Sequence, residues 1–234
     1  MTSTIDPSTK LGQLVRTNPE FAPVFESFGI DFCCGGDTPL EQACEANDLE
    51  VESVLDRLDD ARTEDQTEPD YDSLSAIIDD IVETHHDYLR SELPSLERVV
   101  RKVARVHGES HPELVQIEAV FLELEAELEH HMEDEEENVF PEIHRLEDAS
   151  SCTDTDTEAI RDAIDHLESE HEGAASLLDE IRSLSDDYEI PKDACMSYRN
   201  MFDRLHMLES DMHMHVHKEN NVLFPEAEVR LEAV

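Results

Sequence analysis

The chain has 234 residues, which is enough for one medium domain or for a small domain beside a larger one. Sixty acidic residues outnumber 17 basic ones, and the formal net charge of -43 is spread along the whole sequence. Such a surface repels nucleic acid and anionic lipid, so we expect neither as a partner. No apolar run approaches the roughly 20 residues of a membrane span, and the first ten residues lack a signal-peptide pattern. The sequence therefore predicts a cytoplasmic protein.

The acidic surplus has two interpretations. It could bind cations, but no acidic run is grouped like an EF-hand loop. The alternative is a solvated coat like that of proteins from salt-loving cytoplasms, where high salt screens the self-repulsion. We favour this halophilic interpretation, which predicts instability at low salt.

The chain has five cysteines, two of them adjacent as Cys33 and Cys34. An odd number with an adjacent pair argues against a disulfide framework. The sequence predicts reduced thiols in a reducing compartment.

We expect two helical domains, with boundaries at 1–61 and 71–234. The segment 62–70 is polar and has no apolar periodicity, which is typical of a linker. In the small domain, 19–28 predicts a short helix, and the glycine-rich turn 29–36 either presents or buries the two thiols. Helical stretches predicted at about 72–107, 112–147, 157–186 and 191–230, the last starting at Pro191, make an antiparallel four-helix bundle. The fold class is therefore all-α.

Polar residues of the kind that bind metals interrupt the apolar stripes of three predicted helices. In the second helix the stripe leads to His131 and Glu135, in the third to His171, and in the fourth to His215 and Glu219. Residues four apart lie about 6 Å apart along a helix and roughly 40° apart around it, so each His-x3-Glu pair aims at one point. The sequence predicts that these five side chains point inward.

The two pairs belong to an internal repeat, in which a histidine, a glutamate four residues later and a Phe-Pro dipeptide recur at 131–141 and 215–225. The repeat predicts a pseudo-symmetric site. In the first helix His85 and His86 stand 100° apart, and periodicity slightly favours His85. The histidines at 111, 144, 166, 206, 213 and 217 mostly fall off the stripes and are interpreted as surface residues.

Taken singly, each inward histidine is more simply a core residue with satisfied hydrogen bonds. Taken together, four imidazoles and two carboxylates in an apolar bundle need compensation, because unpaired buried charge is costly. A dinuclear metal centre would compensate the buried charge. The alternative is a hydrogen-bonded network without metal. A mixed set of nitrogen and oxygen ligands suits transition metals better than calcium or magnesium, which prefer oxygen alone. Iron fits best, and zinc and manganese are alternatives.

Both halves of the chain resemble the repair-of-iron-centres (RIC) family, which includes the ScdA and YtfE types. The residues that carry the resemblance are the turn 29–36 with Leu40 and Cys44, His86-Asp87, Leu93-Pro94, His131-Met132, Glu135-Glu136, Phe140-Pro141, 168–171 and 219–225. The resemblance implies a haemerythrin-like four-helix bundle preceded by a small domain with paired cysteines. It also implies the metal ligands His86, His131, Glu135, His171, His215 and Glu219. At the first helix we follow the resemblance and choose His86, with a distortion near Pro94 turning the helix.

The resemblance further implies a di-iron protein with an oxo-bridged centre, which repairs iron-sulfur clusters after oxidative or nitrosative damage by donating iron. It favours an iron-donating repair protein over a conventional enzyme, with no catalytic residue named. Its partners would be iron-sulfur proteins, and a homodimer is also open. Cys33 and Cys34 would receive iron or sulfur, or dock the client, while the alternative makes them small buried apolar residues. Two further functions compete: binding or sensing of oxygen or nitric oxide, and reduction of nitric oxide or peroxide.

Overall fold

The computed structural model describes residues 5–62, 71–147 and 154–232. Their regular structure is helical, apart from one isolated antiparallel bridge between Lys10 and Pro39. The chain divides into two compact units, one made of Met1–Ile77 with His213–Ala233 and the other of Ile78–Met212 with Val234. No helix of the described ranges has the length and apolar character that crossing a membrane would require.

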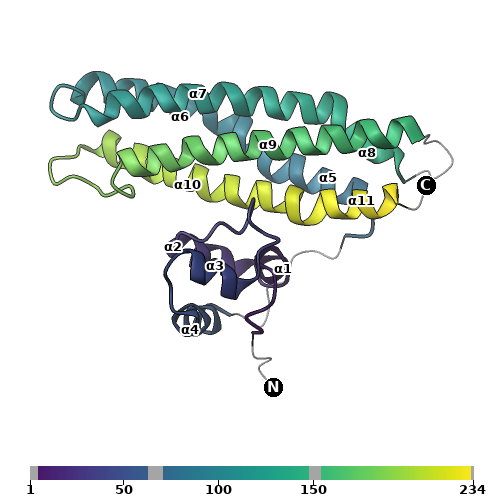
Figure 1. Cartoon of the computed structure of the whole chain (residues 1–234). Coiled ribbons are helices and arrows are strands. Elements are labelled where there is room, and N and C mark those ends of the chain that lie inside the picture. The colour runs from purple at the N-terminus through teal and green to yellow at the C-terminus, as the bar shows by residue number, and fades with distance from the viewer. Residues whose placement is uncertain (1–4, 63–70, 148–153, 233–234) are drawn as a thin grey trace. The chain divides into compact units, whose positions relative to one another are not determined.

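The second unit holds the body of a four-helix bundle, whose long helices run alongside one another (Figure 1). They are α6 (Asp87–His107), α7 (Glu113–Asp134), α9 (Asp154–Leu184) and α10 (Met196–Lys218). Helix α7 packs against α6 and α9. Arg182 joins α9 to Glu209 of α10, and Arg204 joins α10 to Glu92 of α6. These contacts close the ring of four helices, as the sequence predicts.

Three of the long helices are joined to shorter ones through π-helical turns. Helix α5 (Leu74–Ile81) leads through η2 (Val82–His86) into α6, α7 through η3 (Glu135–Val139) into α8 (Phe140–Arg145), and α10 through η4 (Glu219–Leu223) into α11 (Phe224–Leu231). Each composite helix matches one of the predicted helical stretches. The π-turns are the feature that the sequence does not predict.

The last long helix begins later than the sequence predicts. Helix α10 begins at Met196, and Pro191 instead begins a turn in which its carbonyl accepts the Ala194 N–H. Asp186, Asp187 and Tyr188 have positive φ values, which lead the chain out of α9 into this connection. The prediction that Pro191 opens the helix is therefore wrong.

The first unit contains a small helical segment around a compact apolar core. Its helices are α1 (Leu11–Thr17), the 3-10 turn η1 (Pro19–Phe21), α2 (Ala22–Ser27), α3 (Leu40–Ala46) and α4 (Val51–Ala61). Phe21, Phe25, Leu40, Val54 and Leu58 are fully buried in this unit. Of the predicted linker 62–70, only Arg62 lies within the described residues, so the proposed domain boundaries keep the status of a prediction.

Candidate metal centre

Three histidines and one glutamate of the second unit are buried where an apolar core would be expected. His86 ends η2, His131 lies in α7, Glu135 begins η3, and His171 lies in α9. None is more than 3% exposed, and Glu135 is fully enclosed. The inward direction that the stripes predict for His131, Glu135 and His171 agrees with this burial.

Two of these imidazoles are oriented by outer glutamates. His86 Nδ1 lies 2.6 Å from Glu136 Oε1, and His131 Nδ1 lies 2.7 Å from Glu170 Oε2. Their other nitrogens face the two oxygens of one carboxylate: His86 Nε2 is 3.2 Å from Glu135 Oε2, and His131 Nε2 is 3.4 Å from Glu135 Oε1. A carboxylate behind each imidazole fixes its tautomer and raises its basicity, an arrangement typical of metal-binding histidines.

His171 completes the inward set of this unit. Its Nε2 lies 3.1 Å from His131 Nε2, so the two ring nitrogens face each other. Two nitrogens at this separation can both reach one cation at a bond length of about 2.1 Å. The pair is therefore compatible with a shared ion.

His215 and Glu219 are the corresponding pair of the first unit. His215 lies in the last turn of α10 and Glu219 begins η4, and both are fully buried. His215 Nε2 is 2.9 Å from Glu219 Oε1, the contact expected of residues four apart on one helix face.

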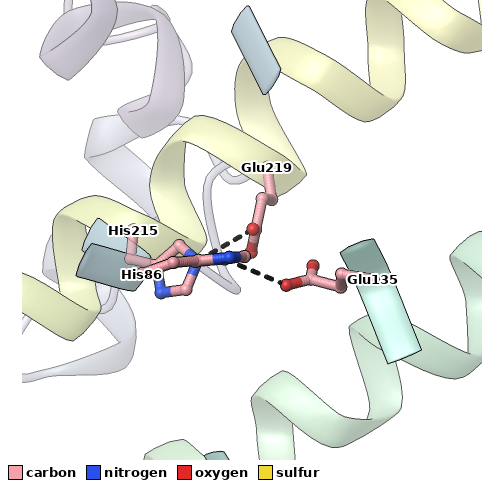
Figure 2. Close-up of side chains that lie close together, drawn as sticks. All are labelled: His86, Glu135, His215 and Glu219. Atoms are coloured by element: carbon pink, nitrogen blue, oxygen red, sulfur yellow. Dashed lines mark ion pairs between the residues drawn. The ribbon is translucent and has the colours of Figure 1, made fainter. Parts of the chain in front are cut away.

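The ligand-type atoms of these six residues form two groups that could each hold a metal ion. The first group is His86, Glu135, His215 and Glu219, and the second is His131, Glu135, His171 and Glu219. Within each group the atoms lie within 4.8 Å of one another. Figure 2 shows the side chains of the first group converging on one point. Both groups contain the same two glutamates and differ in their histidines.

The three π-turns lie at these residues. Each contains a backbone N–H that donates to the carbonyl five residues back, from Asp87 to Val82, Phe140 to Glu135 and Phe224 to Glu219. In the second and third turns the next residue is Pro141 or Pro225, which lacks an N–H and would crowd the carbonyl four residues back. A wider turn relieves this conflict, so the repeated Phe-Pro dipeptide accounts for two of the turns. Such π-turns often occur at functional sites.

The first π-turn explains why two adjacent histidines are both buried. One buried stripe runs through Leu74, Ile78, Ile81 and His85, and a second runs through His86, Leu89, Leu93 and Leu96. Each stripe has steps of three and four, and the turn inserts one residue between them. His85 Nδ1 then meets Asp211 Oδ1 at 3.0 Å, whereas His86 faces Glu135. The expected distortion near Pro94 is wrong, because α6 continues through Pro94 and the distortion lies at η2.

The prediction that His217 lies on the surface is also wrong. The side chain is fully buried, and its ring centroid lies 5.9 Å from that of Phe32. Burial lowers the pKa of His217 to about 4, and the positive charges of Lys218 and Arg16 add to this effect. Phe32 of the small helical segment packs against His217, and the periodicity of the bundle helices gives no indication of this contact.

Cys33 and Cys34 lie in the glycine-rich turn of the first unit and belong to neither group above. Cys33 is buried and Cys34 is half-buried, and neither forms a disulfide. The pKa of the Cys33 thiol is raised well above its ordinary value by a hydrogen bond with Cys34, by burial and by nearby negative charge. The turn thus buries one thiol and partly presents the other.

A cavity of about 270 Å³ opens beside the second group. His131 and His171 line it together with Leu128, Glu170 and Met212. Apolar side chains such as Leu128 and Met212 line it beside polar ones such as Glu170, and pockets that bind small molecules combine the two kinds. A molecule of a few atoms can therefore approach these two histidines.

The residues present fit a metal. Glu135 and Glu219 are two fully buried carboxylates with ligand atoms within 4.8 Å of each other, and like charges at this distance repel strongly without a cation or a proton. Four imidazoles and two carboxylates favour iron, zinc or manganese over calcium and magnesium.

Comparisons with known proteins agree with this arrangement. Residues 77–227 match the haemerythrin HHE cation-binding domain, and residues 7–62 match ScdA_N, a domain of unknown function (DUF542). The iron-sulfur cluster repair protein ScdA of Staphylococcus haemolyticus is 32% identical over 92% of this chain and 95% of its own length. The iron-sulfur cluster repair protein YtfE of Dickeya chrysanthemi is 34% identical over 93% and 95%, respectively.

A probable iron-sulfur cluster repair protein of Haemophilus influenzae is 30% identical over 92% of this chain. These relatives span both matched domains, and the haemerythrin match alone covers more than half of the sequence. The chain therefore belongs to the haemerythrin HHE cation-binding family and, within it, to the iron-sulfur cluster repair proteins of the ScdA and YtfE type.

Proposed function

We propose that the protein repairs iron-sulfur clusters damaged by oxidative or nitrosative stress, and that it does so by donating iron from a di-iron centre. Its clients are cytoplasmic iron-sulfur proteins. The names of its relatives support the repair function, and the haemerythrin family supports iron as the metal. The donor set of the buried groups is compatible with both.

The observation that carries the proposal is that two four-residue groups have both glutamates in common. We assign Glu135 and Glu219 as ligands common to two irons, His86 and His215 to one iron, and His131 and His171 to the other. Each iron would then be held by two histidines and by the two glutamates. Iron held by these residues would supply redox chemistry and could bind an oxo bridge or a small molecule.

The outer glutamates hold two of the imidazoles that would bind iron in a fixed orientation. Arg90 donates a 2.7 Å hydrogen bond to the same Glu136 oxygen that meets His86. Burial raises the pKa of Glu136, but the hydrogen bonds from His86 and Arg90 outweigh it, and the net shift lowers the pKa. Glu136 therefore stays ionised at neutral pH and holds His86 with its Nε2 toward Glu135.

The assignment is tested by metal analysis with absorption and Mössbauer spectra of the anaerobically purified protein. We expect two irons per chain and an antiferromagnetically coupled pair. One iron per chain, or zinc in place of iron in protein from iron-replete cells, would contradict it.

The repair function needs its own experiment. The iron-loaded protein is incubated anaerobically with an iron-sulfur enzyme whose cluster has been oxidised, and recovery of that enzyme's activity is measured. We expect faster recovery than with an equal amount of ferrous salt or with the Glu219→Ala variant. Equal recovery with all three would contradict the donor function. It would not contradict the assignment of the metal ligands.

The cavity beside His131 and His171 favours a second candidate, the binding or reduction of a small molecule such as oxygen, nitric oxide or peroxide. Anaerobic addition of nitric oxide to the reduced iron protein distinguishes the two. Stoichiometric binding without turnover supports a binding protein, and sustained consumption with an electron donor supports a reductase.

A further inference from the structure

A third group of metal-binding residue types lies in the turn that carries the paired cysteines. Ligand-type atoms of Asp31, Cys33 and Cys34 lie within 4.8 Å of one another. Asp31 Oδ1 accepts the backbone N–H of Cys33 at 3.1 Å and that of Cys34 at 2.9 Å, and it lies 3.3 Å from Cys33 Sγ. One carboxylate oxygen therefore holds both cysteines in a tight turn, with both thiols and the carboxylate on a common side.

The turn is fixed in place by Asn221. Its Nδ2 donates to the carbonyl of Cys33 at 2.8 Å. A Cβ added at Gly36 would lie 1.8 Å from Asn221 Oδ1, and one added at Gly12 would lie 2.3 Å from it. The Gly12 N–H donates to the Gly36 carbonyl at 2.9 Å, so the two glycines are joined to each other around this side chain. A side chain at either position would therefore displace the Asn221 amide from its hydrogen bond with Cys33.

The remaining glycine of the turn has a separate reason. A Cβ at Gly35 would lie 2.7 Å from the backbone oxygen of Asp31, closer than real Cβ contacts allow. The sequence Cys-Cys-Gly-Gly thus combines two thiols with two glycines. A side chain at Gly35 would clash with the backbone of Asp31, and one at Gly36 would displace the Asn221 amide. If the two cysteines were only small apolar residues of the core, these specific contacts around the turn would not be needed.

Asn221 lies in η4, two residues after Glu219. The corresponding residue of the internal repeat, two residues after Glu135, is Glu137, which is exposed. The repeat itself therefore does not require a half-buried amide at this position. Its presence links the cysteine turn to the segment that carries Glu219.

Two thiols and a carboxylate are ligands for a borderline or soft divalent ion such as Fe²⁺, Co²⁺ or Zn²⁺. A cation at this point would lie within reach of two thiolates and one carboxylate, all of which are anionic ligands. We propose that Asp31, Cys33 and Cys34 form a second metal site of the chain, which binds one thiophilic divalent cation and is held in position by Asn221. Binding replaces the thiol protons, so about two protons are released per cation at neutral pH.

The site is tested with Co²⁺ as the probe, added anaerobically to the full-length, iron-loaded and reduced protein. We expect one additional cobalt per chain, near-ultraviolet thiolate-to-cobalt absorption, and no loss of iron. The double variant Cys33→Ser with Cys34→Ser should lose this absorption and keep its iron. Cys195→Ser, which removes an exposed thiol of the other unit, is the matched control and should bind cobalt like the parent.

Two further variants separate ligation from positioning. Asp31→Asn should weaken cobalt binding at least several-fold while the absorption keeps its thiolate character. Asn221→Asp keeps the shape of the side chain but removes the N–H that Cys33 accepts, and it should weaken cobalt binding with iron content unchanged. The proposal is overturned if the parent shows no thiolate-to-cobalt absorption, or if the double serine variant retains it. Either result would leave the histidine–glutamate groups unaffected, so this failure is distinct from a failure of the di-iron assignment.

Discussion

His85 and His86 are adjacent, and both are buried, yet their ring nitrogens meet different carboxylates. His85 meets Asp211, and His86 lies between Glu136 and Glu135. Of these two histidines, His86 belongs to a group that could hold a metal ion and His85 does not. The extra residue of η2 allows both side chains to point inward, because it shifts the helical phase by about 100° between them.

Alanine at His86 should therefore remove one ligand, whereas alanine at His85 removes only a partner of Asp211. We expect His86→Ala to reduce iron content or alter the Mössbauer spectrum strongly, and His85→Ala to leave both close to those of the parent. The reverse ranking would show that the periodicity argument chose the correct histidine.

The buried glutamates are expected to couple metal binding to stability. Replacing Glu135 or Glu219 with alanine should lose iron and lower the melting temperature, because the surrounding imidazoles are arranged around a cation. The measurements are metal content and thermal unfolding by circular dichroism. His130→Ala is the control, since His130 is exposed and adjacent to His131. His217 is unsuitable as a control because it is buried. Unchanged iron and melting temperature in both glutamate variants would refute their assignment.

Most residues of the candidate metal centre can be predicted from the sequence. Apolar periodicity selects five of the six proposed ligands, because a polar residue on a buried stripe is costly and therefore informative. It selects the wrong member of the histidine pair because a π-turn changes the phase of the helix. The burial of His217 depends on the small helical segment, which is remote from it in the sequence.

At the scale of the helices, α7 contains a buried carboxyl away from the metal groups. Glu125 is 9% exposed, and burial raises its pKa to about 7, with the negative charges of Glu97 and Glu129 adding to the shift and Arg101 opposing it. A folded-state pKa above the unfolded value of about 4.5 means that the folded protein holds this proton more tightly. The stabilisation is present below about pH 4.5 and is lost as the pH rises through about 7.

Glu125→Gln should therefore stabilise the protein at pH 8 and have little effect at pH 5. A gain of about 1 kcal/mol would raise the melting temperature by about 2–4 °C in a chain of this size. Melting curves at the two pH values, with iron content held equal, measure it. Glu123→Gln, on the exposed face of the same helix, is the matched control, because Glu123 does not contribute to the shift at Glu125. A gain that is equal at both pH values would show that ionisation of Glu125 is not its cause.

The sequence predicts the four composite helices because their stripes are long and regular. It misplaces the start of α10 because Pro191 suits both a helix start and a turn. It gives no sign of the π-turns until Pro141 and Pro225 are considered one residue beyond Phe140 and Phe224. A proline six residues after each proposed glutamate ligand is the feature of the sequence that could have predicted these two π-turns.

At the scale of the whole chain, the two matched domains do not overlap in sequence, and the proposed ligands all fall within residues 77–227. A protein starting near Glu68 should therefore still bind two irons. Its melting temperature should fall, because His217 and Asn221 lose the contacts with Phe32 and Cys33 that the small helical segment provides. If the shortened protein bound no iron while remaining helical, the small domain would be required for the metal centre itself.

The large negative net charge of the chain should make its stability depend on salt. Acidic residues outnumber basic ones by more than three to one, so repulsion among carboxylates outweighs the attraction in surface pairs such as Arg101–Glu97. Raising the salt concentration from about 0.1 M to about 1 M shortens the screening length from ~10 Å to ~3 Å, which weakens that repulsion.

We therefore expect the melting temperature to rise steadily with potassium chloride over this range, and expect sucrose at matched osmolarity to produce a smaller rise. The iron content of each sample is measured alongside, because loss of metal at low salt would also lower the melting temperature. If the melting temperature stayed constant or fell with added salt at constant iron, the acidic coat would not be the adaptation to a salt-rich cytoplasm that we propose. Self-repulsion would then be too weak to affect folding, even at this net charge.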